Sequence, residues 1–447
     1  MKKIITLGII MFSAFVFTSC VPNDYIHVDK NNTSGPWDGT KTHPFAKIQQ
    51  GLNKAVALKY DGVIVHSGVY NENVILEDNM SLIGDKNTAP SFINGNISSP
   101  TITLKGRNYV SDLSIGGGSV GIYVDVDKML SVSDKPMTII NDNIIESKYA
   151  IHVKTSKNLT FGAKDRKNPW VSISGNWIKM SYSSGSTGIR VDLTGPKTGV
   201  IALKIDINDN IICEKSSGII FFAEGQGPNP GGFVRADITG EIANNLLYDN
   251  TLDGISMESK NLGDASTLIF GNTIVYNGGH AIVSDTSTGS DGDAMTHPNV
   301  TNNILAFNKG YGYLELDLKT SASDLDNNIF YQNNSGHYSD YDTQKDINSQ
   351  AGLNTPMVQS KVVFNSGSGN LVTNPQFQKG GLYLNGIDYG KDKAGEFFLT
   401  QAGVNKSPGV DNGFGSAKNG GISKKTTSVT YSFDTGNADI GFHYTKQ

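Results

Sequence analysis

Apolar residues recur at fixed offsets from an asparagine that appears once every 25–35 residues between positions 143 and 328. The positions three before and two after each of these seven asparagines are all apolar. In a chain with 37% hydrophobic residues, chance does not produce that agreement. Self-similarity at such a period is typical of solenoids. The asparagines are Asn143, Asn176, Asn210, Asn245, Asn272, Asn303 and Asn328.

A second pattern follows 7 to 12 residues after most of these asparagines: a small residue, then apolar and variable residues in alternation. Examples are "GIRV" from Gly188, "GISM" from Gly254 and "AIVS" from Ala281. Alternation with a period of two predicts short β-strands. Stacked coils of such strands make a parallel β-solenoid with rungs about 4.8 Å apart, in which the asparagine amides form a ladder at one corner.

Upstream of these repeats, the stretch "HPFAKIQQGLNKAVA" has the spacing of a helix. Phe45, Ile48, Leu52 and Ala55 recur at helical intervals after Pro44. We expect a short amphipathic helix there. It would cover the open end of the first coil, which otherwise leaves a bare strand edge.

The first twenty residues are typical of an export signal. Two lysines precede an apolar run from Ile4 to Phe17, and "TSC" follows it. The run is too short to span a bilayer as a mature helix. The stretch resembles the lipobox of bacterial lipoproteins, which implies a signal peptide over 1–19, lipidation of Cys20, a tether over 20–24 and a membrane anchor at the outer membrane or cell surface. An ordinary signal peptide with an incidental cysteine is the alternative.

Net charge, cysteines and histidines indicate which kinds of partner and metal are not expected. Removing residues 1–19 takes away two lysines and no acid, which changes the net charge from −5 to −7. An acidic chain repels phosphates, so we expect no nucleic-acid partner. Cys213 has neither a partner cysteine nor a metal-ligand spacing and is expected to be a packing residue. The eight histidines show no paired spacing, so zinc is not expected.

The stretch "YIHVDKNNTSGPWDGTKTHPFAKIQQGLNKA…DGVIVHSGVYNENV" resembles the N-terminal cap and first coils of bacterial right-handed parallel β-helix surface lipoproteins, similar to the family 9 polysaccharide lyase group. Residues 369–377, 396–413 and 438–444 are similar to the closing segments of that group. The resemblance implies a monomer with an all-β, right-handed parallel β-helix over 25–350, which includes the N-terminal capping helix. A β-rich closing segment over 351–447 would pack on it.

Lyases of that family, as the resemblance implies, use calcium held by an aspartate cluster and a lysine that abstracts a proton from the sugar. This chain has no clear aspartate cluster at a coil corner followed by such a lysine. No catalytic residue is therefore carried over, and the fold alone does not define an activity.

Each strand of the second pattern points two side chains outward, at the positions two and four residues after its small residue. On stacked strands these side chains form two columns, here called files. The first file holds Tyr123, His152, Arg190, Ile220, Ser256 and Val283. The second holds Asp125, Lys154, Asp192, Phe222, Glu258 and Asp285. Long insertions follow several of these strands, and they would wall a groove suited to an elongated polymer.

Two interpretations of these files stay open. In the first, they form a solvated face on which exposed charge pairs contribute ~0–1 kcal/mol each. In the second, they form a site with a base or charge clamp, acids and cation ligands. Its candidate catalytic residues are Lys154, Arg190 and Asp192. Its candidate substrate-binding residues are Tyr123, His152, Glu258 and Asp285. Its candidate calcium ligands are Asp285, Asp291 and Asp293.

The sequence therefore predicts an exported, lipid-anchored surface protein that binds polysaccharide along one outward face. Whether it also processes the polymer, in a lyase-like or hydrolase-like manner, is left open by these residues. The alternative is a non-catalytic structural or adhesive protein with the solenoid as a rigid spacer. A walled groove would favour the first function, and a flat face without aromatic residues the second.

Overall fold

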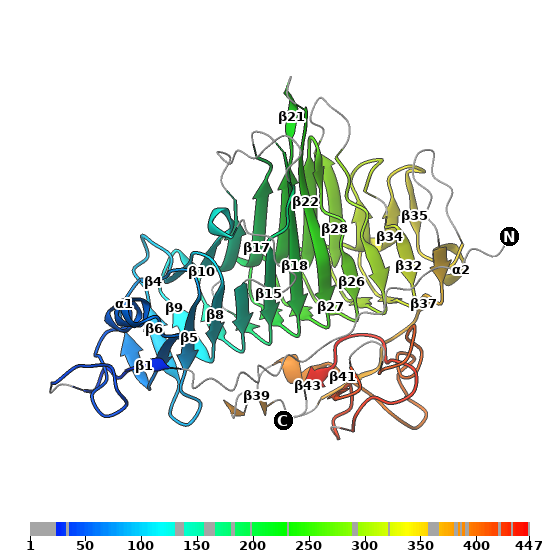
Figure 1. Ribbon diagram of the computed structural model, residues 1–447. Helices are drawn as coiled ribbons and strands as arrows, with labels where there is room; N and C mark the ends of the chain where they lie inside the picture. Colours follow the sequence, from blue (N-terminus) through cyan, green and yellow to red (C-terminus); the bar gives the residue numbers. More distant parts are fainter. Residues whose placement is uncertain are drawn as a thin grey trace.

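The described chain is a stack of coils, each built from three short β-strands (Figure 1). This computed structural model describes residues 24–445 apart from residues 33–34, 130–137, 156–165, 180–183, 197–198, 230–231, 288–293, 321, 356–365, 380–382, 385–386, 389–392, 419–421 and 431. Consecutive strands of a coil join three different sheets in turn, so each sheet gathers strands from many coils.

Three sheets, here called A, B and C, run the length of the stack. Sheet A contains, in spatial order, β1 (Tyr25–Val28), β2 (Gly62–Val65), β5 (Met80–Gly84), β8 (Asn108–Ser111), β11 (Thr138–Asn141), β15 (Trp170–Ser174), β18 (Val200–Asn208), β22 (Gly232–Ala243), β26 (Leu268–Phe270), β29 (Asn299–Thr301), β32 (Asp324–Asp326) and β36 (Ser366–Ser368). Beside this path lie β14 (Arg166–Lys167), β21 (Gln226–Asn229) and β25 (Gly263–Asp264).

Sheet B contains β3 (Gly68–Tyr70), β6 (Ser91–Asn94), β9 (Leu113–Gly116), β12 (Ile144–Glu146), β16 (Trp177–Ile178), β19 (Ile211–Cys213), β23 (Leu246–Tyr248), β27 (Thr273–Val275), β30 (Ile304–Ala306), β33 (Ile329–Tyr331) and β37 (Leu371–Val372). Sheet C contains β4 (Val74–Leu76), β7 (Ile102–Leu104), β10 (Val120–Asp125), β13 (Tyr149–Lys154), β17 (Thr187–Thr194), β20 (Ser217–Glu224), β24 (Ile255–Lys260), β28 (Ile282–Ser287), β31 (Tyr311–Glu315), β34 (Gly336–Asp340) and β35 (Lys345–Ile347).

The order of the strands repeats from coil to coil. β11, β12 and β13 follow one another in sheets A, B and C, and β15, β16 and β17 repeat that order one rung further on. The corresponding strands pair in parallel. This is the right-handed parallel β-helix that the sequence predicts. β36 and β37 continue the ladder beyond residue 350, and the predicted domain boundary there stays a prediction.

The apolar columns of the repeat line the interior of the stack. All fourteen predicted positions have 0% relative exposure, from Ile140 and Ile145 to Leu325 and Phe330, so this prediction is confirmed. They belong to one continuous core that extends from the first coil to the last. Cys213 is buried, as predicted for a packing residue.

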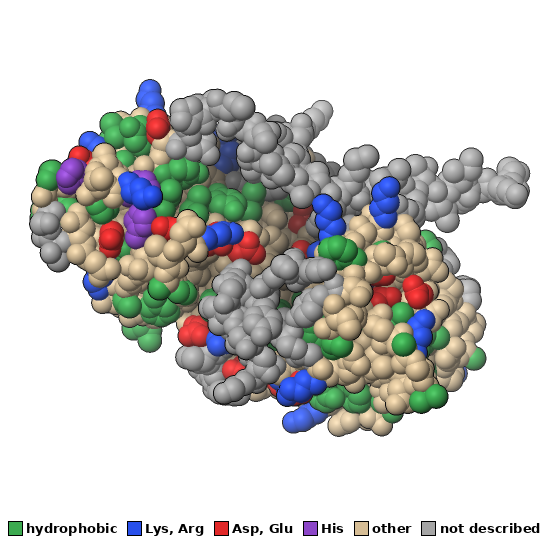
Figure 2. Space-filling model, turned by 90° about the horizontal axis from the view of Figure 1, so that it is seen from below, with side chains coloured by type: hydrophobic (Ala, Val, Ile, Leu, Met, Phe, Trp, Pro, Cys, Tyr) green, Lys and Arg blue, Asp and Glu red, His purple; other side chains and the backbone are tan. Residues whose placement is uncertain are grey.

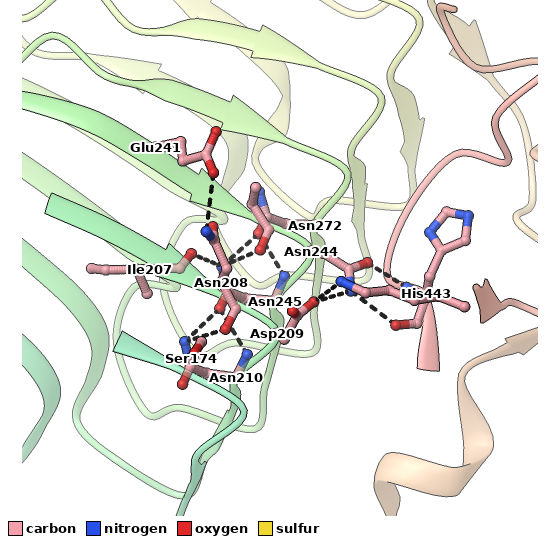
Figure 3. A network of polar contacts seen from close by, with 12 residues as sticks. Ser174, Ile207, Asn208, Asp209, Asn210, Glu241, Asn244, Asn245, Asn272 and His443 are labelled. Carbon is pink, nitrogen blue, oxygen red and sulfur yellow. Dashed lines mark hydrogen bonds and ion pairs between the residues drawn. The ribbon is translucent and has the colours of Figure 1, made fainter. Parts of the chain in front are cut away.

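The predicted asparagine ladder stands at the corner between sheets A and B. The backbone N–H and side-chain amide of Asn245 both donate to Asn272 Oδ1, at 2.8 and 3.0 Å. Asn272 Nδ2 in turn donates to the Ile242 carbonyl and to Asn303 Oδ1. The contact repeats on each rung, and Figure 3 shows three of its members. The ladder continues past the predicted seven members to Asn370.

The residue before a ladder asparagine takes a left-handed backbone conformation, which turns the chain sharply at this corner. Asp, Asn and Gly visit this region more readily than other residues. The corners with a non-glycine residue have φ between 52° and 64°, at Asp142, Asp209, Asn244, Asn302 and Asn327.

The N-terminal helix α1 (Ile48–Leu58) buries Ile48, Leu52 and Ala55, as its spacing predicts. Its first turn is capped from a distance, because the Glu72 carboxylate accepts the backbone N–H groups of Ile48 and Gln49. The expected start at Pro44 and Phe45 is wrong. Phe45 lies before the helix and instead bridges in parallel to Val28, where its backbone N–H donates to the His27 carbonyl.

The C-terminal part of the chain covers the outer face of sheet B with apolar side chains. It contains α2 (Gln350–Leu353), β38 (Phe377–Gln378), β39 (Tyr383–Leu384), β40 (Ile387–Asp388), β41 (Phe398–Leu399), β42 (Lys425–Thr426) and β43 (Tyr444–Thr445). Figure 1 shows β39, β41 and β43 of this segment below the stack of coils, whereas α2 lies at the end of the stack. Ile211, Leu246 and Ile304 of sheet B form one buried apolar cluster with Phe398 and Phe442 of the closing segment.

Seen from below, the closing segment bulges from one part of the solenoid, and hydrophobic side chains gather on the coils beside it (Figure 2). The apolar cluster between the closing segment and sheet B contains no residue of sheet C. Among the described residues, this cluster therefore covers sheet B and leaves sheet C uncovered. None of the helices in the described chain has the length and apolar character needed to cross a bilayer.

Candidate functional site

The two outward files predicted from the sequence are neighbouring columns of sheet C. Tyr123 pairs with His152, and His152 pairs with Arg190 on the next rung. In the second file, Lys154 pairs with Asp192. The files continue in register through β20, β24 and β28, which places Phe222 beside Glu258 and Glu258 beside Asp285. The alignment is confirmed; the roles of its members stay predictions.

A compact polar cluster occupies the middle of this face. His152 Nε2 lies 2.8 Å from Asp192 Oδ2, and Arg190 Nε lies 2.9 Å from each oxygen of the same carboxylate. Tyr123 meets the His152 ring edge-on at 5.8 Å, and Tyr149 lies tilted against it at 6.1 Å. The cluster joins three successive rungs, because its members come from β10, β13 and β17.

Asp192 lies at the centre of this cluster, because its carboxylate contacts both His152 and Arg190. Burial by itself would raise the pKa of Asp192, but the hydrogen bonds and charges of His152 and Arg190 outweigh burial and hold the pKa below its usual value. The carboxylate is therefore ionised at neutral pH and fixes the two cationic or hydrogen-bonding side chains beside it. The role of Asp192 as a catalytic residue stays a prediction.

Lys154, the third predicted catalytic residue beside Arg190 and Asp192, is exposed at the end of β13. It lies in register between Asp125 on one side and Asp192 on the other. Burial, followed by the nearby charge of Asp127, raises the pKa of Asp125. Lys154 therefore stands between two carboxylates whose pKa values move in opposite directions.

The far half of the face combines an aromatic ring with acids. Lys260 Nζ lies 3.0 Å from Glu258 Oε1 and 5.1 Å from the centre of the Phe222 ring. Burial raises the pKa of Asp285, and the charges of Glu258 and Asp317 raise it further. Acids crowded in this way favour protonation or a cation.

The predicted calcium ligands Asp291 and Asp293 lie outside the described residues, as do Cys20 and the signal peptide. The calcium site and the lipid anchor stay predictions. The loops predicted to wall a groove include residues 230–231 and 288–293, which are also not described, so the groove stays a prediction as well.

A second polar network, on the outer face of sheet A, was not predicted as a site. Asp206 and Glu241 are direct neighbours on adjacent rungs. Trp170 Nε1 donates to Asp206 at 2.7 Å. Asn208 donates to Glu241 at 3.0 Å (Figure 3). Burial is the main cause that raises the pKa of both carboxyls. The clearest signal in the sequence is that Asp206 and Glu241 stand at the same distance before a ladder asparagine.

Asp192 and Asp125 make a matched pair for a pH test. A carboxyl whose pKa is lowered by folding stabilises the native state above its unfolded pKa of about 4, and this stabilisation is lost as the pH falls through its folded pKa. We expect Asp192→Asn to lower the free energy of unfolding by about 1–3 kcal/mol at pH 7. The deficit should shrink below about pH 4.

For Asp125 the sign is reversed, because its raised pKa makes the ionised form unfavourable in the folded chain. Asp125→Asn should raise the free energy of unfolding at pH 7, and the gain should vanish in acid. Urea unfolding of both variants between pH 7 and pH 3 measures this. Two variants that shift stability in the same direction at pH 7 would contradict the assignment.

The fold and the outward face define a parallel β-helix protein with one apolar side covered and one polar side carrying aromatic and charged groups. No protein-family model matches the chain, and no curated protein does. Solved structures do match. An exopolygalacturonase from Thermotoga maritima is 11% identical with a TM-score of 0.31, over 64% of this chain and 83% of that one.

Two further matches are 14% identical and each cover 73% of this chain. Tailspike protein 3 of bacteriophage CBA120 has a TM-score of 0.32 over 54% of its own length. The A-module of a mannuronan C-5 epimerase from Azotobacter vinelandii has a TM-score of 0.27 over 94% of its length. At these identities and TM-scores, the matches decide nothing about the activity of this chain.

Proposed function

We propose that the chain is an exported surface lipoprotein that binds polysaccharide along the outward face of sheet C. The observation that carries the proposal is the cluster of Tyr123, Tyr149, His152 and Arg190 around Asp192. Aromatic faces pack against the apolar faces of sugar rings, while fixed polar groups orient the hydroxyl or carboxylate groups. Successive rungs repeat such groups along one line, as an elongated polymer requires.

The ion pairs on this face favour a second candidate function, a stiff spacer with a solvated surface. Arg190 is engaged with Asp192, and Lys260 with Glu258. Ion pairs on a protein surface form without any ligand, so these contacts alone do not require a bound polymer. The two functions differ in a direct way, because the first needs a polymer to bind this face and the second does not.

A binding panel separates the two. We expect affinity electrophoresis through neutral and uronate polysaccharides to retard the wild type, and Tyr123→Ala and Arg190→Gln to weaken retardation at least tenfold for the retained polymer. Tyr109→Ala on sheet A is the matched control and should bind like the wild type. Absorbance of unsaturated sugar products in the same samples tests for lyase activity. If no polymer retards the wild type, the spacer function replaces binding.

The lipid anchor has its own test. Expression with a labelled fatty acid should label the wild type and place it in the membrane fraction, because several acyl chains anchor firmly. Cys20→Ser should remove the label and release the chain. A wild type that carries no label would leave an ordinary export signal in place of the lipobox.

A further inference from the structure

Three potential metal ligands converge inside the closing segment, away from sheet C. Asp434, Asp439 and His443 have relative exposures of 7%, 4% and 1%. One ligand atom from each lies within 4.8 Å of the other two. All three residues come from the ten-residue stretch "DTGNADIGFH", which supplies two carboxylates and one imidazole.

The imidazole of His443 is held as a metal ligand would be. Its Nδ1 lies 2.8 Å from the Gly441 carbonyl, an acceptor, so Nδ1 carries a hydrogen. In the neutral ring, Nε2 then carries the lone pair, and it lies 2.9 Å from Asp434 Oδ2, also an acceptor. Two lone pairs at this distance need a proton or a cation between them. Metal-bound histidines usually donate their other N–H to a carbonyl or carboxylate in this way.

The two carboxylates are oriented by the surrounding chain. Asp434 Oδ2 accepts the backbone N–H of Asp439 at 2.9 Å, and Asp439 Oδ1 accepts the backbone N–H of Asp411 at 2.8 Å. The Thr427 hydroxyl donates to the other oxygen of Asp439. These contacts fix the direction of the carboxylates.

The charge inside this cluster favours a divalent cation over a proton. Asp434, Asp439 and His443 lie together with at most 7% relative exposure, so water does not screen the charges of the two carboxylates. A protonated imidazole would compensate one carboxylate and leave the second buried with its charge, which is costly. One divalent ion with a neutral imidazole compensates both.

We propose that Asp434, Asp439 and His443 bind one divalent transition-metal ion, with zinc the best match to the ligands. Calcium and magnesium prefer sites made entirely of oxygen, whereas imidazole with carboxylates suits zinc and its neighbours. The site is independent of the polysaccharide proposal. It goes against the expectation from histidine spacing, because that expectation considered pairs of histidines and not one histidine with two aspartates.

The position of the site indicates a structural role. The backbone N–H of His443 donates to Asn244 Oδ1 at 2.6 Å, and the His443 carbonyl accepts from Asn244 Nδ2 at 2.9 Å (Figure 3). Asn244 is the left-handed corner residue next to ladder Asn245. A metal ion at His443 would therefore stabilise the closing segment at the point where His443 bonds to Asn244 at the corner of the solenoid.

The test uses the full chain. Metal analysis of the purified protein, after dialysis without chelator, should find about one transition-metal ion per molecule, and chelation should lower the melting temperature until zinc restores it. His443→Gln and Asp434→Asn should lose the ion and bind added zinc at least tenfold more weakly. His43→Gln, on an exposed loop of the first coil, is the control and should keep the ion.

Two results would overturn the proposal. One is a wild type that carries no ion and whose melting temperature responds neither to chelator nor to zinc, calcium or manganese, since the cluster then holds a proton. The other is a calcium response without a zinc response, which would place the ion elsewhere. If the variants fail to fold, removal of the ion from the wild type and its return by zinc titration still decide between these outcomes.

Discussion

Replacing Asn272 by alanine is expected to lower the free energy of unfolding of the solenoid by roughly 3–6 kcal/mol. The Asn272 side-chain amide makes four buried hydrogen bonds: its Oδ1 accepts the backbone N–H and the side-chain amide of Asn245, and its Nδ2 donates to the Ile242 carbonyl and to Asn303 Oδ1. Alanine leaves each partner group without that hydrogen bond, and a buried orphaned group costs about 1–3 kcal/mol. Asn272 has 0% exposure, so these groups are out of contact with bulk water.

Chemical denaturation of the variant measures this loss. Asn87→Ala is the matched control, since Asn87 is exposed and its side chain bonds locally to Asp85. The control should stay within about 0.5 kcal/mol of the wild type. An Asn272→Ala variant as stable as the control would mean that the ladder contributes nothing to stability and that the apolar columns alone define the corner.

Phe398→Ala should release the closing segment from sheet B, at a cost of about 3–5 kcal/mol to the docked state. Phe398 has 0% exposure and stacks on Tyr444 with ring centres 3.8 Å apart. The Tyr444 hydroxyl donates to the Ala394 carbonyl, which joins the two ends of the segment. Loss of one ring therefore removes packing from both β41 and β43.

Limited proteolysis with mass spectrometry detects this release. Cleavage should begin within residues 394–445 of the variant while the fragment that ends near residue 372 stays intact, because the solenoid has a core of its own. Phe414→Ala is the control, since that ring is 53% exposed. Simultaneous cleavage of the solenoid and the segment would show instead that the two unfold as one unit.

The sequence was sufficient for features that repeat on every rung. Apolar columns and ladder asparagines recur at offsets that burial imposes, because a displaced residue would put an aliphatic side chain into water or leave an amide without a partner. A second ladder was missed, although Asn250, Asn277, Asn308 and Asn333 each follow a ladder asparagine by five residues and bond to one another.

The reason for that omission is visible at its first rung. Five residues after Asn210 stands Lys215, which has 1% exposure and whose ammonium reaches the Ser147 carbonyl at 2.6 Å. Burial lowers the pKa of Lys215 to about 8. A lysine in the place of an asparagine breaks the sequence pattern. The fold tolerates Lys215 because its long side chain brings the ammonium group to the Ser147 carbonyl.

The candidate site was less accessible to sequence reasoning. Register alone placed His152, Arg190 and Asp192 on one face, and the structure confirms that placement. Which of them form hydrogen bonds depends on side-chain rotamers and on the loops beside the strands, neither of which repeats from coil to coil. The cluster around His443 was missed for the same reason, since it depends on how an irregular segment folds back on itself.

Distances along sheet C test the stacked arrangement most directly. Thr103, Ser256 and Ser339 belong to one column, with five rung steps between the first two and eight between the first and last. In a chain with both cysteines replaced by alanine, spin labels at Thr103 and Ser256 should be about 24 Å apart, and labels at Thr103 and Ser339 about 38 Å, given about 4.8 Å per rung. Narrow double electron–electron resonance distributions that grow in this proportion are the expected result. Broad distributions, or a distance that does not increase from the first pair to the second, would show that the repeats do not stack as successive rungs.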